Sequence, residues 1–198
     1  MVEKKEMRDF RGGYEEPAML EAMAMALEMR LVSPVYRRLV RGLGLAGSER
    51  VLEFGTGPGE YAFQLARRLE KGGGELTCVD ISKRFNRIAR RRLSRFDFIG
   101  YCVGSLNEID LPEEHYDVVV MNFVLHELDK SLRSPAVEIL AGALAAGGKL
   151  FVAEPTSRNH GIQPGEISRI MEECGLEEVY MKKKKTIAGP VVRCAYEK

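Results

Sequence analysis

The feature that most constrains the fold is an alternation of short apolar runs with segments of helical spacing between residues 50 and 153. Two of the runs, Val118-Val119-Val120 and Leu150-Phe151-Val152, are continuous rather than alternating. Strands covered on both faces have this composition, because neither face has to meet water. The sequence therefore predicts an α/β fold whose sheet is mostly parallel and carries helices on both faces.

Start and stop signals give approximate bounds for the elements. The predicted strands span residues 50–54, 75–80, 96–103, 116–122 and 149–153, and the predicted helices span 17–30, 33–42, 60–70, 82–94, 134–145 and 165–174. Ser33-Pro34 is expected to be an N-cap followed by proline at the first helical position, and Ser82 is expected to cap the helix after the second strand. Gly147-Gly148 is interpreted as the stop signal of the helix before the fifth strand.

The C-terminal segments 177–187 and 191–197 are separated only by Ala188-Gly189-Pro190. This link is too short for a crossover helix, so the two segments are expected to form an antiparallel hairpin. Lysines 182–185 would then lie near a sheet edge, where charge discourages strand addition. The expected architecture is a doubly wound, mostly parallel, seven-stranded sheet with a C-terminal antiparallel hairpin. Residues 1–198 are expected to form one domain, with an N-terminal arm and helices (1–42) over the site and a Rossmann-like core (43–198).

The composition excludes several classes of protein. Apolar residues make up 45% and charged residues 30%, and the formal net charge is only +1, which argues against a dedicated nucleic-acid binder. The sequence has no apolar stretch of about 20 residues, so no membrane partner is expected. The charged start is not a secretory signal, and the four cysteines lack metal-ligand spacing, which predicts a cytoplasmic protein without a metal.

The first predicted strand leads into a glycine-rich turn, Glu53-Phe54-Gly55-Thr56-Gly57-Pro58-Gly59. Glycines at this position let the backbone turn tightly and approach a ligand. The spacing GxGxG lacks the third glycine of the dinucleotide fingerprint, and no Lys-Ser or Lys-Thr follows as in a P-loop. Glu53 would repel a pyrophosphate and attract an ammonium or a sulfonium. The turn therefore predicts an adenosyl ligand that carries positive charge and no phosphates.

Polar residues also stand at the ends of the next strands, where ligands bind in open α/β sheets. Asp80 can accept hydrogen bonds from both hydroxyls of a ribose, and the third strand ends at residues 104–106, in position to border an adenine. The fourth strand ends at Asn122. The candidate cofactor-binding residues are Glu53, Gly55, Thr56, Gly57, Gly59, Asp80, Ile81, Gly104, Ser105, Leu106 and Asn122.

With these residues the chain resembles the class I S-adenosylmethionine-dependent methyltransferases, in particular the small-molecule group that includes the ubiquinone/menaquinone-biosynthesis type. The matching segments are 53–59, Asp80, 116–122, His126-Glu127-Leu128 and 144–150, and the resemblance covers about residues 39–153 and the terminal hairpin. It implies that Glu53 and the glycine turn hold the methionine part of S-adenosylmethionine, Asp80 the ribose, and Ser105-Leu106 the adenine edge. The family usually has Asp in place of Ser105, and a hydroxyl is the weaker acceptor.

The expected activity is methyl transfer from S-adenosylmethionine to a small-molecule acceptor by in-line displacement, which needs alignment and exclusion of water rather than a triad or a metal. The acceptor is expected to bind under residues 1–42. His126 is a candidate general base, or else a helix-start residue of the family signature. The pairs Met19/Met23 and Met25/Met29 are compatible with a substrate pocket or with helix packing.

Two rival functions remain at this stage. One is an RNA or protein methyltransferase on the same fold, which would use the arginines between residues 84 and 95 and lysines 182–185. These charges are more typical of a solvated helix face and an edge strand, so nucleic acid is not expected as a partner. The other is a non-catalytic subunit that binds S-adenosylmethionine. The sequence leaves the acceptor atom and the oligomeric state open.

Overall fold

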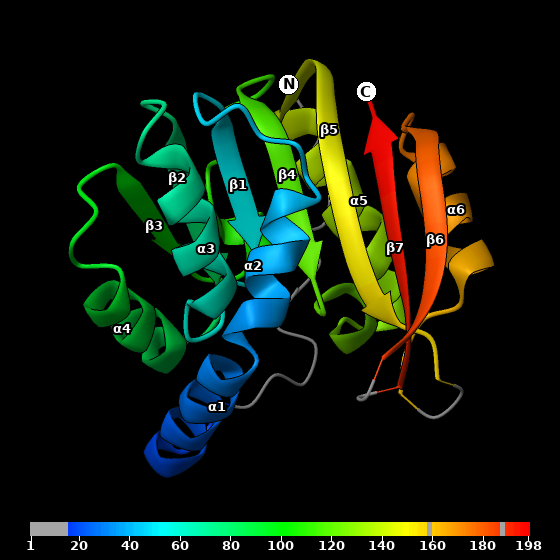
Figure 1. The fold of residues 1–198 in the computed structure, drawn as a ribbon. Coiled ribbons are helices and arrows are strands. Elements are labelled where there is room, and N and C mark those ends of the chain that lie inside the picture. The colour runs from blue at the N-terminus through cyan, green and yellow to red at the C-terminus, as the bar shows by residue number, and fades with distance from the viewer. Residues whose placement is uncertain (1–15, 158–159, 187–188) are drawn as a thin grey trace.

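The computed structural model describes residues 16–157, 160–186 and 189–198. Its strands are β1 (Arg50–Phe54), β2 (Glu75–Asp80), β3 (Ile99–Val103), β4 (Tyr116–Asn122), β5 (Leu144–Pro155), β6 (Glu177–Thr186) and β7 (Gly189–Glu197). They form one seven-stranded sheet in the order β3-β2-β1-β4-β5-β7-β6 (Figure 1). The pairs from β3 to β5 are parallel, and β7 is antiparallel to both β5 and β6. The predicted fold class is confirmed.

Helices cover both faces of the sheet (Figure 1). They are α1 (Met19–Leu31), α2 (Ser33–Arg41), α3 (Glu60–Leu69), α4 (Lys83–Arg92), α5 (Lys130–Ala143) and α6 (Pro164–Glu173), with short 3-10 turns η1 (Leu106–Glu108) and η2 (Leu125–Glu127). Leu140 of α5 and Ile167 of α6 belong to the apolar core on one face of the sheet. Leu65 of α3 and Ala89 of α4 belong to the core on the other face. None of the helices in the described part of the chain is long and apolar enough to cross a membrane.

The strand order reverses between β1 and β4. From β1 the chain proceeds through β2 to β3 on one side, and then returns to place β4 on the opposite side of β1. Phe54 at the end of β1 lies beside Met121 near the end of β4 in the parallel register. Because no crossover covers this point, the carboxyl ends of β1 and β4 border an open region in which a ligand can bind.

Several boundaries differ from the sequence prediction, and three of the differences change the interpretation of a residue. Helix α5 ends at Ala143 and β5 already begins at Leu144, so Gly147-Gly148 lies inside a strand and is not a helix stop. A β-carbon at Gly148 would lie 3.1 Å from the Tyr116 carbonyl oxygen, next to a register shift between β4 and β5. Glycine is needed there for a close approach of two strands.

The other two differences are local. Val32 rather than Ser33 occupies the N-cap position of α2, and the Ser33 hydroxyl accepts a hydrogen bond from the Gln64 amide at 3.0 Å. Strand β3 begins at Ile99 rather than at residue 96, because the Phe96 ring packs edge-to-face against Phe63 and Phe98. Ser82 caps α4 as predicted and accepts a hydrogen bond from the Phe85 amide at 3.0 Å.

The expected N-terminal arm lies almost entirely outside the described residues, which begin at Glu16. The carboxylate of Glu16 accepts hydrogen bonds from the Ser82 hydroxyl and from the Arg84 amide, both at 2.8 Å. These bonds join the segment before α1 to the first turn of α4, beside the end of β2. The organisation of residues 1–198 as one domain stays a prediction.

Candidate functional site

A cavity of about 670 Å³ opens at the carboxyl ends of β1, β2 and β4. Ligand pockets for cofactor-sized molecules typically measure about 300–1,000 Å³. All of the predicted cofactor residues except Glu53 and Gly59 line this cavity: Gly55, Thr56, Gly57, Asp80, Ile81, Gly104, Ser105, Leu106 and Asn122. The structure therefore brings together residues that the sequence spreads over about a third of the chain.

The three glycines of the loop after β1 have different roles. A β-carbon at Gly57 would meet nothing within 4 Å, so this residue is the open tip of the loop at the cavity. A β-carbon at Gly55 would lie 2.2 Å from the Val124 side chain, so this glycine allows the loops after β1 and β4 to pack. At Gly59 it would lie 3.0 Å from the Ala89 side chain. Gly59 therefore allows the start of α3 to pack against α4. It was expected among the cofactor-binding residues, but it does not line the cavity.

Asp80 connects the end of β2 to the glycine loop. One carboxylate oxygen accepts a hydrogen bond from the Gly57 amide at 2.6 Å, and the other accepts one from the Ser82 amide at 2.8 Å. Burial raises the pKa of Asp80, and these two bonds oppose the rise. A carboxylate has about four acceptor sites, so two bonds leave capacity for a ligand at the cavity wall.

Glu53 is buried below the loop, with an exposed fraction of 2%. Burial raises the pKa of its carboxyl to about 8, the hydrogen bond with Thr56 acts in the opposite direction, and the charge of Asp80 adds to the rise. With that pKa the free carboxyl is mostly protonated at pH 7, with about a tenth of it ionised. A cation bound in the cavity would favour its ionised form.

The end of β3 supplies the wall next to Asp80. Ser105 is buried, and its hydroxyl lies 2.5 Å from the Asn107 side-chain oxygen. A hydroxyl that donates to Asn107 keeps its own lone pairs as acceptors. Leu106 and Phe85 add apolar surface to the same cavity. This end of the cavity suits a flat heterocycle with an amino group.

The loop after β4 enters the site with a strained backbone. Phe123 is a non-glycine residue with φ of 60°, a conformation that costs on the order of 1–3 kcal/mol and is concentrated at functional sites. Its amide donates to the Ala153 carbonyl at 2.8 Å. Both Phe123 and Val124 line the cavity.

Glu154, which the sequence analysis did not identify, organises this loop from the end of β5. It is fully buried, and its carboxylate accepts hydrogen bonds from the Val124 amide at 2.9 Å and the Leu125 amide at 2.8 Å. The same carboxylate lies 2.6 Å from Nδ1 of His126. One buried charge therefore holds both the backbone and the histidine of η2.

The side chain of His126 is correspondingly fixed. Burial lowers its pKa, but the hydrogen bond and charge of Glu154 and the charge of Glu127 outweigh this, so the pKa is raised. Its other ring nitrogen, Nε2, lies 2.8 Å from a Glu127 oxygen and 3.2 Å from Nε2 of His160. No motif in the sequence singles out His160, which the structure places beside His126.

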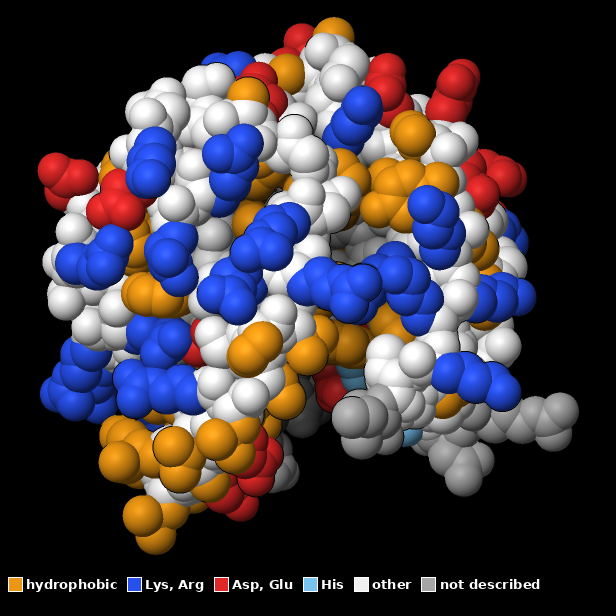
Figure 2. Space-filling model, in the orientation of Figure 1, with side chains coloured by type: hydrophobic (Ala, Val, Ile, Leu, Met, Phe, Trp, Pro, Cys, Tyr) orange, Lys and Arg blue, Asp and Glu red, His pale blue; other side chains and the backbone are white. Residues whose placement is uncertain are grey.

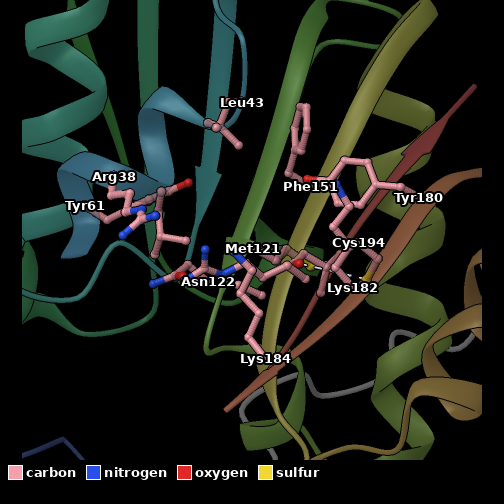
Figure 3. A pocket seen from close by; sticks show the side chains of 15 residues that line it. Arg38, Leu43, Tyr61, Met121, Asn122, Phe151, Tyr180, Lys182, Lys184 and Cys194 are labelled. Carbon is pink, nitrogen blue, oxygen red and sulfur yellow. Dashed lines mark hydrogen bonds between the residues drawn. The ribbon is translucent and has the colours of Figure 1, made fainter. Parts of the chain in front are cut away.

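A second, smaller cavity of about 220 Å³ lies between α2 and the strands β4 to β7. Figure 3 shows Arg38 and Tyr61 on one side of it and Tyr180, Lys182 and Lys184 on the other. Arg193 also lines it, and Asn122 borders both cavities. Figure 2 shows Lys and Arg side chains gathered around a hollow on this face of the molecule. We call this second cavity the cationic cleft.

Four cations of the cationic cleft, Arg38, Lys182, Lys184 and Arg193, form no ion pair with another described residue. Burial lowers the pKa of Arg193, and the charge of Arg38 adds to this effect. Lys182 and Lys184 are two residues apart on the edge strand β6, so both project from the same face. From the sequence alone these lysines were expected only to protect a sheet edge, and their spacing of two is the signal that places them on one face.

The N-terminal helices contribute residues to the larger cavity. Met25 and Met29 of α1 and Tyr36 of α2 line it. Of the two methionine pairs, only Met25/Met29 faces the cavity, whereas Met19 and Met23 are exposed and do not line it. The i,i+4 spacing predicted one shared face for each pair but not which pair would face the site.

The fold and the loop after β1 together define the architecture of class I S-adenosylmethionine-dependent methyltransferases. A structure from Aquifex aeolicus, described as a SAM-dependent methyltransferase, superposes with a TM-score of 0.73 at 19% identity and covers 92% of this chain and 99% of that one. The N-methyltransferase NodS from Bradyrhizobium japonicum, in complex with S-adenosyl-L-homocysteine, gives 0.69 at 21% identity, covering 85% and 86%.

The sequence comparisons support the same assignment. Residues 51–148 match the family model described as a methyltransferase domain. A demethylmenaquinone methyltransferase of Tropheryma whipplei is 30% identical over 118 residues, which cover 60% of this chain and 46% of the relative. The chain therefore spans about half the length of this curated relative. The resemblance predicted from the motifs is confirmed.

We expect Glu154→Ala to destabilise the protein by about 3 kcal/mol or more, because it leaves two buried amide donors and His126 without an acceptor. The free energy of unfolding from urea denaturation measures this change. Glu173→Ala is the matched control, since Glu173 forms an exposed i,i+4 pair with Arg169 and should change stability by roughly 0.5 kcal/mol or less. Equal effects of the two substitutions would contradict the role given to Glu154.

Proposed function

We propose that the chain binds S-adenosylmethionine in the larger cavity and transfers its methyl group to a small-molecule acceptor. The observation that carries this proposal is the carboxylate of Asp80, which lies at the cavity wall and is hydrogen-bonded to the open tip of the glycine loop at Gly57. A carboxylate in that position repels a pyrophosphate and accepts hydrogen bonds from a ribose diol. The NodS complex, which contains the demethylated cofactor, supports the choice of ligand.

The residues around the cavity suggest how each part of the cofactor binds. Asp80 would accept the ribose hydroxyls, and Ser105 and Leu106 would border the adenine. Gly55, Thr56 and Gly57 would contact the methionine part, and the ionised carboxyl of Glu53 would stabilise its positive charge from below. Ile81, Gly104 and Asn122 would complete the walls, while Gly59 would act only by packing against α4.

The chemistry requires little from the protein beyond alignment. S-adenosylmethionine would supply a methyl group on a sulfonium, so that a lone pair of the acceptor would form the bond to the methyl carbon as the carbon–sulfur bond breaks and its electron pair returns to sulfur. The positive charge of the sulfonium already activates the leaving group, so the protein has to hold the three atoms in line and exclude water. The apolar lining from Met25, Met29 and Phe123 suits that task.

The cationic cleft suggests the class of acceptor. Four unpaired cations and two tyrosines gather beside Asn122, which also borders the cofactor cavity. A carboxylate or phosphate on the acceptor could bind there while the nucleophilic atom points past Asn122 towards the methyl group. We therefore propose an anionic small molecule as acceptor.

His126 as a general base stays a proposal. Its Nδ1 is engaged by Glu154, so only Nε2 could take a proton from an acceptor. That nitrogen faces Glu127 and His160. A deprotonating role would therefore depend on the acceptor reaching Glu127, which lines the cofactor cavity.

An RNA methyltransferase is less well supported, because several arginines of α4 are engaged within the chain. Arg92 pairs with Glu60, and the Arg90 guanidinium lies over the Tyr101 ring at 4.2 Å. Arg84 donates to the backbone oxygens of Glu16 and Pro17. Arginines that are used in packing are not available as a continuous track for phosphates.

The function is tested by incubating the protein with methyl-labelled S-adenosylmethionine and a metabolite extract, then separating labelled products by mass and by ion exchange. We expect a labelled small molecule that is retained on an anion exchanger. Label in RNA or protein instead would favour the rival methyltransferase. Cofactor binding without any labelled product, from extracts of several sources, would favour the non-catalytic subunit.

We expect Asp80→Ala to weaken S-adenosylmethionine binding about ten- to a thousandfold. The substitution removes two charge-assisted hydrogen bonds of about 1.5–3 kcal/mol each, and competition with water reduces their net contribution. Asp80→Asn should lose less, since the amide keeps one acceptor oxygen. Calorimetric titration measures both, and Asp97→Ala, which removes an exposed carboxylate, is the control.

Because Asp80 also holds the glycine loop, thermal melting must accompany these titrations. A lowered melting temperature with an unchanged cofactor dissociation constant would assign Asp80 to loop structure alone. A changed constant in a protein that melts normally supports the ribose contact.

The pKa of Glu53 predicts a pH dependence. The free carboxyl titrates at about 8, and a bound cation lowers that pKa, so the cofactor binds the ionised form better. Affinity for S-adenosylmethionine should therefore rise as the pH increases towards and through 8, by about tenfold for each unit of pKa shift. S-adenosyl-L-homocysteine, which has the same amino group but no sulfonium, should show a smaller rise.

The control for this dependence is Glu53→Gln, which cannot ionise. The affinities of this variant for S-adenosylmethionine and S-adenosyl-L-homocysteine, measured by calorimetry over about one pH unit on each side of the Glu53 pKa, should depend on pH in the same way. If the variant keeps the same difference in pH dependence, Glu53 is not the group that responds to the sulfonium.

A further inference from the structure

Outside the proposed cofactor residues, His126, Glu127 and His160 form a compact group of three potential metal ligands, the only such group of His, Cys, Asp and Glu within the described ranges. Nε2 of His126 lies 3.2 Å from Nε2 of His160 and 2.8 Å from a carboxylate oxygen of Glu127. The same oxygen lies 3.7 Å from Nε2 of His160. These three donor atoms thus form a compact triangle, all within 4.8 Å of one another.

The size of this triangle matches a metal coordination sphere. Ligands about 2.0–2.1 Å from a tetrahedral Zn²⁺ are about 3.3 Å from one another. The three distances of 2.8, 3.2 and 3.7 Å scatter around that value. The donor atoms are therefore already spaced as three corners of a tetrahedron, with the fourth corner open.

His126 has the outer hydrogen bond that metal-bound histidines commonly have. Nδ1 lies 2.6 Å from the buried carboxylate of Glu154, which fixes the ring and leaves the lone pair of Nε2 for a metal. Glu154 itself is held by the amides of Val124 and Leu125. His126 is thus oriented by two strands, because Glu154 lies at the end of β5, just before Pro155, and η2 follows β4.

The segment that carries His160 is fixed at both sides of the histidine. Thr156 and Gly161 form an isolated antiparallel bridge, and the Ile162 amide donates to the Pro155 carbonyl at 2.9 Å. The Ser157 hydroxyl donates to the carbonyl of His160. A β-carbon at Gly161 would lie 2.4 Å from the Pro155 oxygen, so the close approach requires glycine. His160 is exposed but its backbone is constrained.

We propose that His126, Glu127 and His160 bind a divalent transition-metal ion, for which Zn²⁺ is the best match. Two imidazoles and one carboxylate with an open position form a donor set that suits Zn²⁺, whereas Mg²⁺ and Ca²⁺ prefer oxygen ligands. Glu127 also lines the cofactor cavity, so a metal ion held by its carboxylate would lie close to the wall of that cavity. An oxygen, nitrogen or sulfur atom of an acceptor could bind there.

The competing account of the same geometry needs no metal. A protonated His126 between the carboxylates of Glu154 and Glu127 would also hold these side chains together, with His160 accepting or donating at its edge. That account predicts no specific uptake of Zn²⁺. Metal binding therefore separates the two, and it does not depend on methyl transfer or on cofactor binding.

The experiment uses the full chain after dialysis against a chelator, titrated with Zn²⁺ by calorimetry and with Co²⁺ by visible absorption. The wild-type chain should take up one equivalent of Zn²⁺ and give the intense visible bands of tetrahedral Co²⁺. His160→Ala and Glu127→Gln should each weaken binding at least tenfold, and Glu154→Gln about ten- to a hundredfold through loss of the outer hydrogen bond.

The matched control is His115→Ala, since His115 lies at the other end of β4 and its ring packs against Tyr116. Its metal affinity should equal that of the wild type. Titration of His160→Ala with S-adenosylmethionine excludes a folding defect, because His160 does not line the cofactor cavity. Thermal melting serves that purpose for Glu127→Gln and Glu154→Gln. Failure of the metal site would leave cofactor binding intact, and failure of the proposed function would leave metal binding intact.

Three outcomes would overturn the proposal. They are no saturable Zn²⁺ binding to the wild type, an unchanged affinity in both His160→Ala and Glu127→Gln, and a Co²⁺ spectrum with the near-ultraviolet bands of thiolate ligands. The last would assign the metal to cysteines, of which Cys102 and Cys174 are partly exposed.

Discussion

The reversal of strand order between β1 and β4 is the constraint on which both cavities depend. At every other parallel pair a crossover helix can pack over the adjacent strands, but at this pair the chain leaves in opposite directions. The loops after β1 and β4 therefore face each other across the opening. Gly55 and Val124 pack together there, and only glycine allows the two loops to approach so closely. Asn122, at the end of β4, then borders both cavities.

Three buried carboxylates at the carboxyl ends of the strands are each stabilised differently. Asp80 and Glu154 accept two backbone amides each, so hydrogen bonds replace much of the lost hydration. Glu53 has no such pair of amides, and its pKa is accordingly raised to about 8. A charge that the protein leaves poorly compensated is one that a ligand can compensate. This asymmetry favours a cationic ligand above Glu53 rather than a neutral one.

The parts of the fold and site that the sequence predicted are those determined by local pattern. The glycine loop, Asp80 and the strand ends at residues 104–106 and 122 follow from apolar runs and their terminators, and parallel register then brings them to one edge. The alternation of β and α segments also predicted the sheet and the terminal hairpin.

The parts that the sequence did not predict depend on contacts between distant segments. His126 and His160 are 34 residues apart, with all of α5 and β5 between them, and no motif spacing connects them. Glu154 looked like one more residue after an apolar strand, because only the packing of β5 against β4 brings it to η2. Gly59 fits the glycine motif by position, but its neighbour is Ala89 on a helix that the motif does not include.

The opposite charges of the two cavities fit one reaction. Buried carboxylates lie around the cofactor cavity, whereas four cations line the cleft beyond Asn122. A sulfonium on one side and an anionic acceptor on the other would each be stabilised where it binds. If the nucleophilic atom itself is negatively charged, transfer of the methyl group neutralises both charges, so the transition state is less polar than the reactants. Such a step is favoured in a cavity with little water, which the methionines of α1 and the ring of Phe123 help to exclude. The separation of charge would thus contribute to binding, and the apolar lining between the two regions would contribute to the rate.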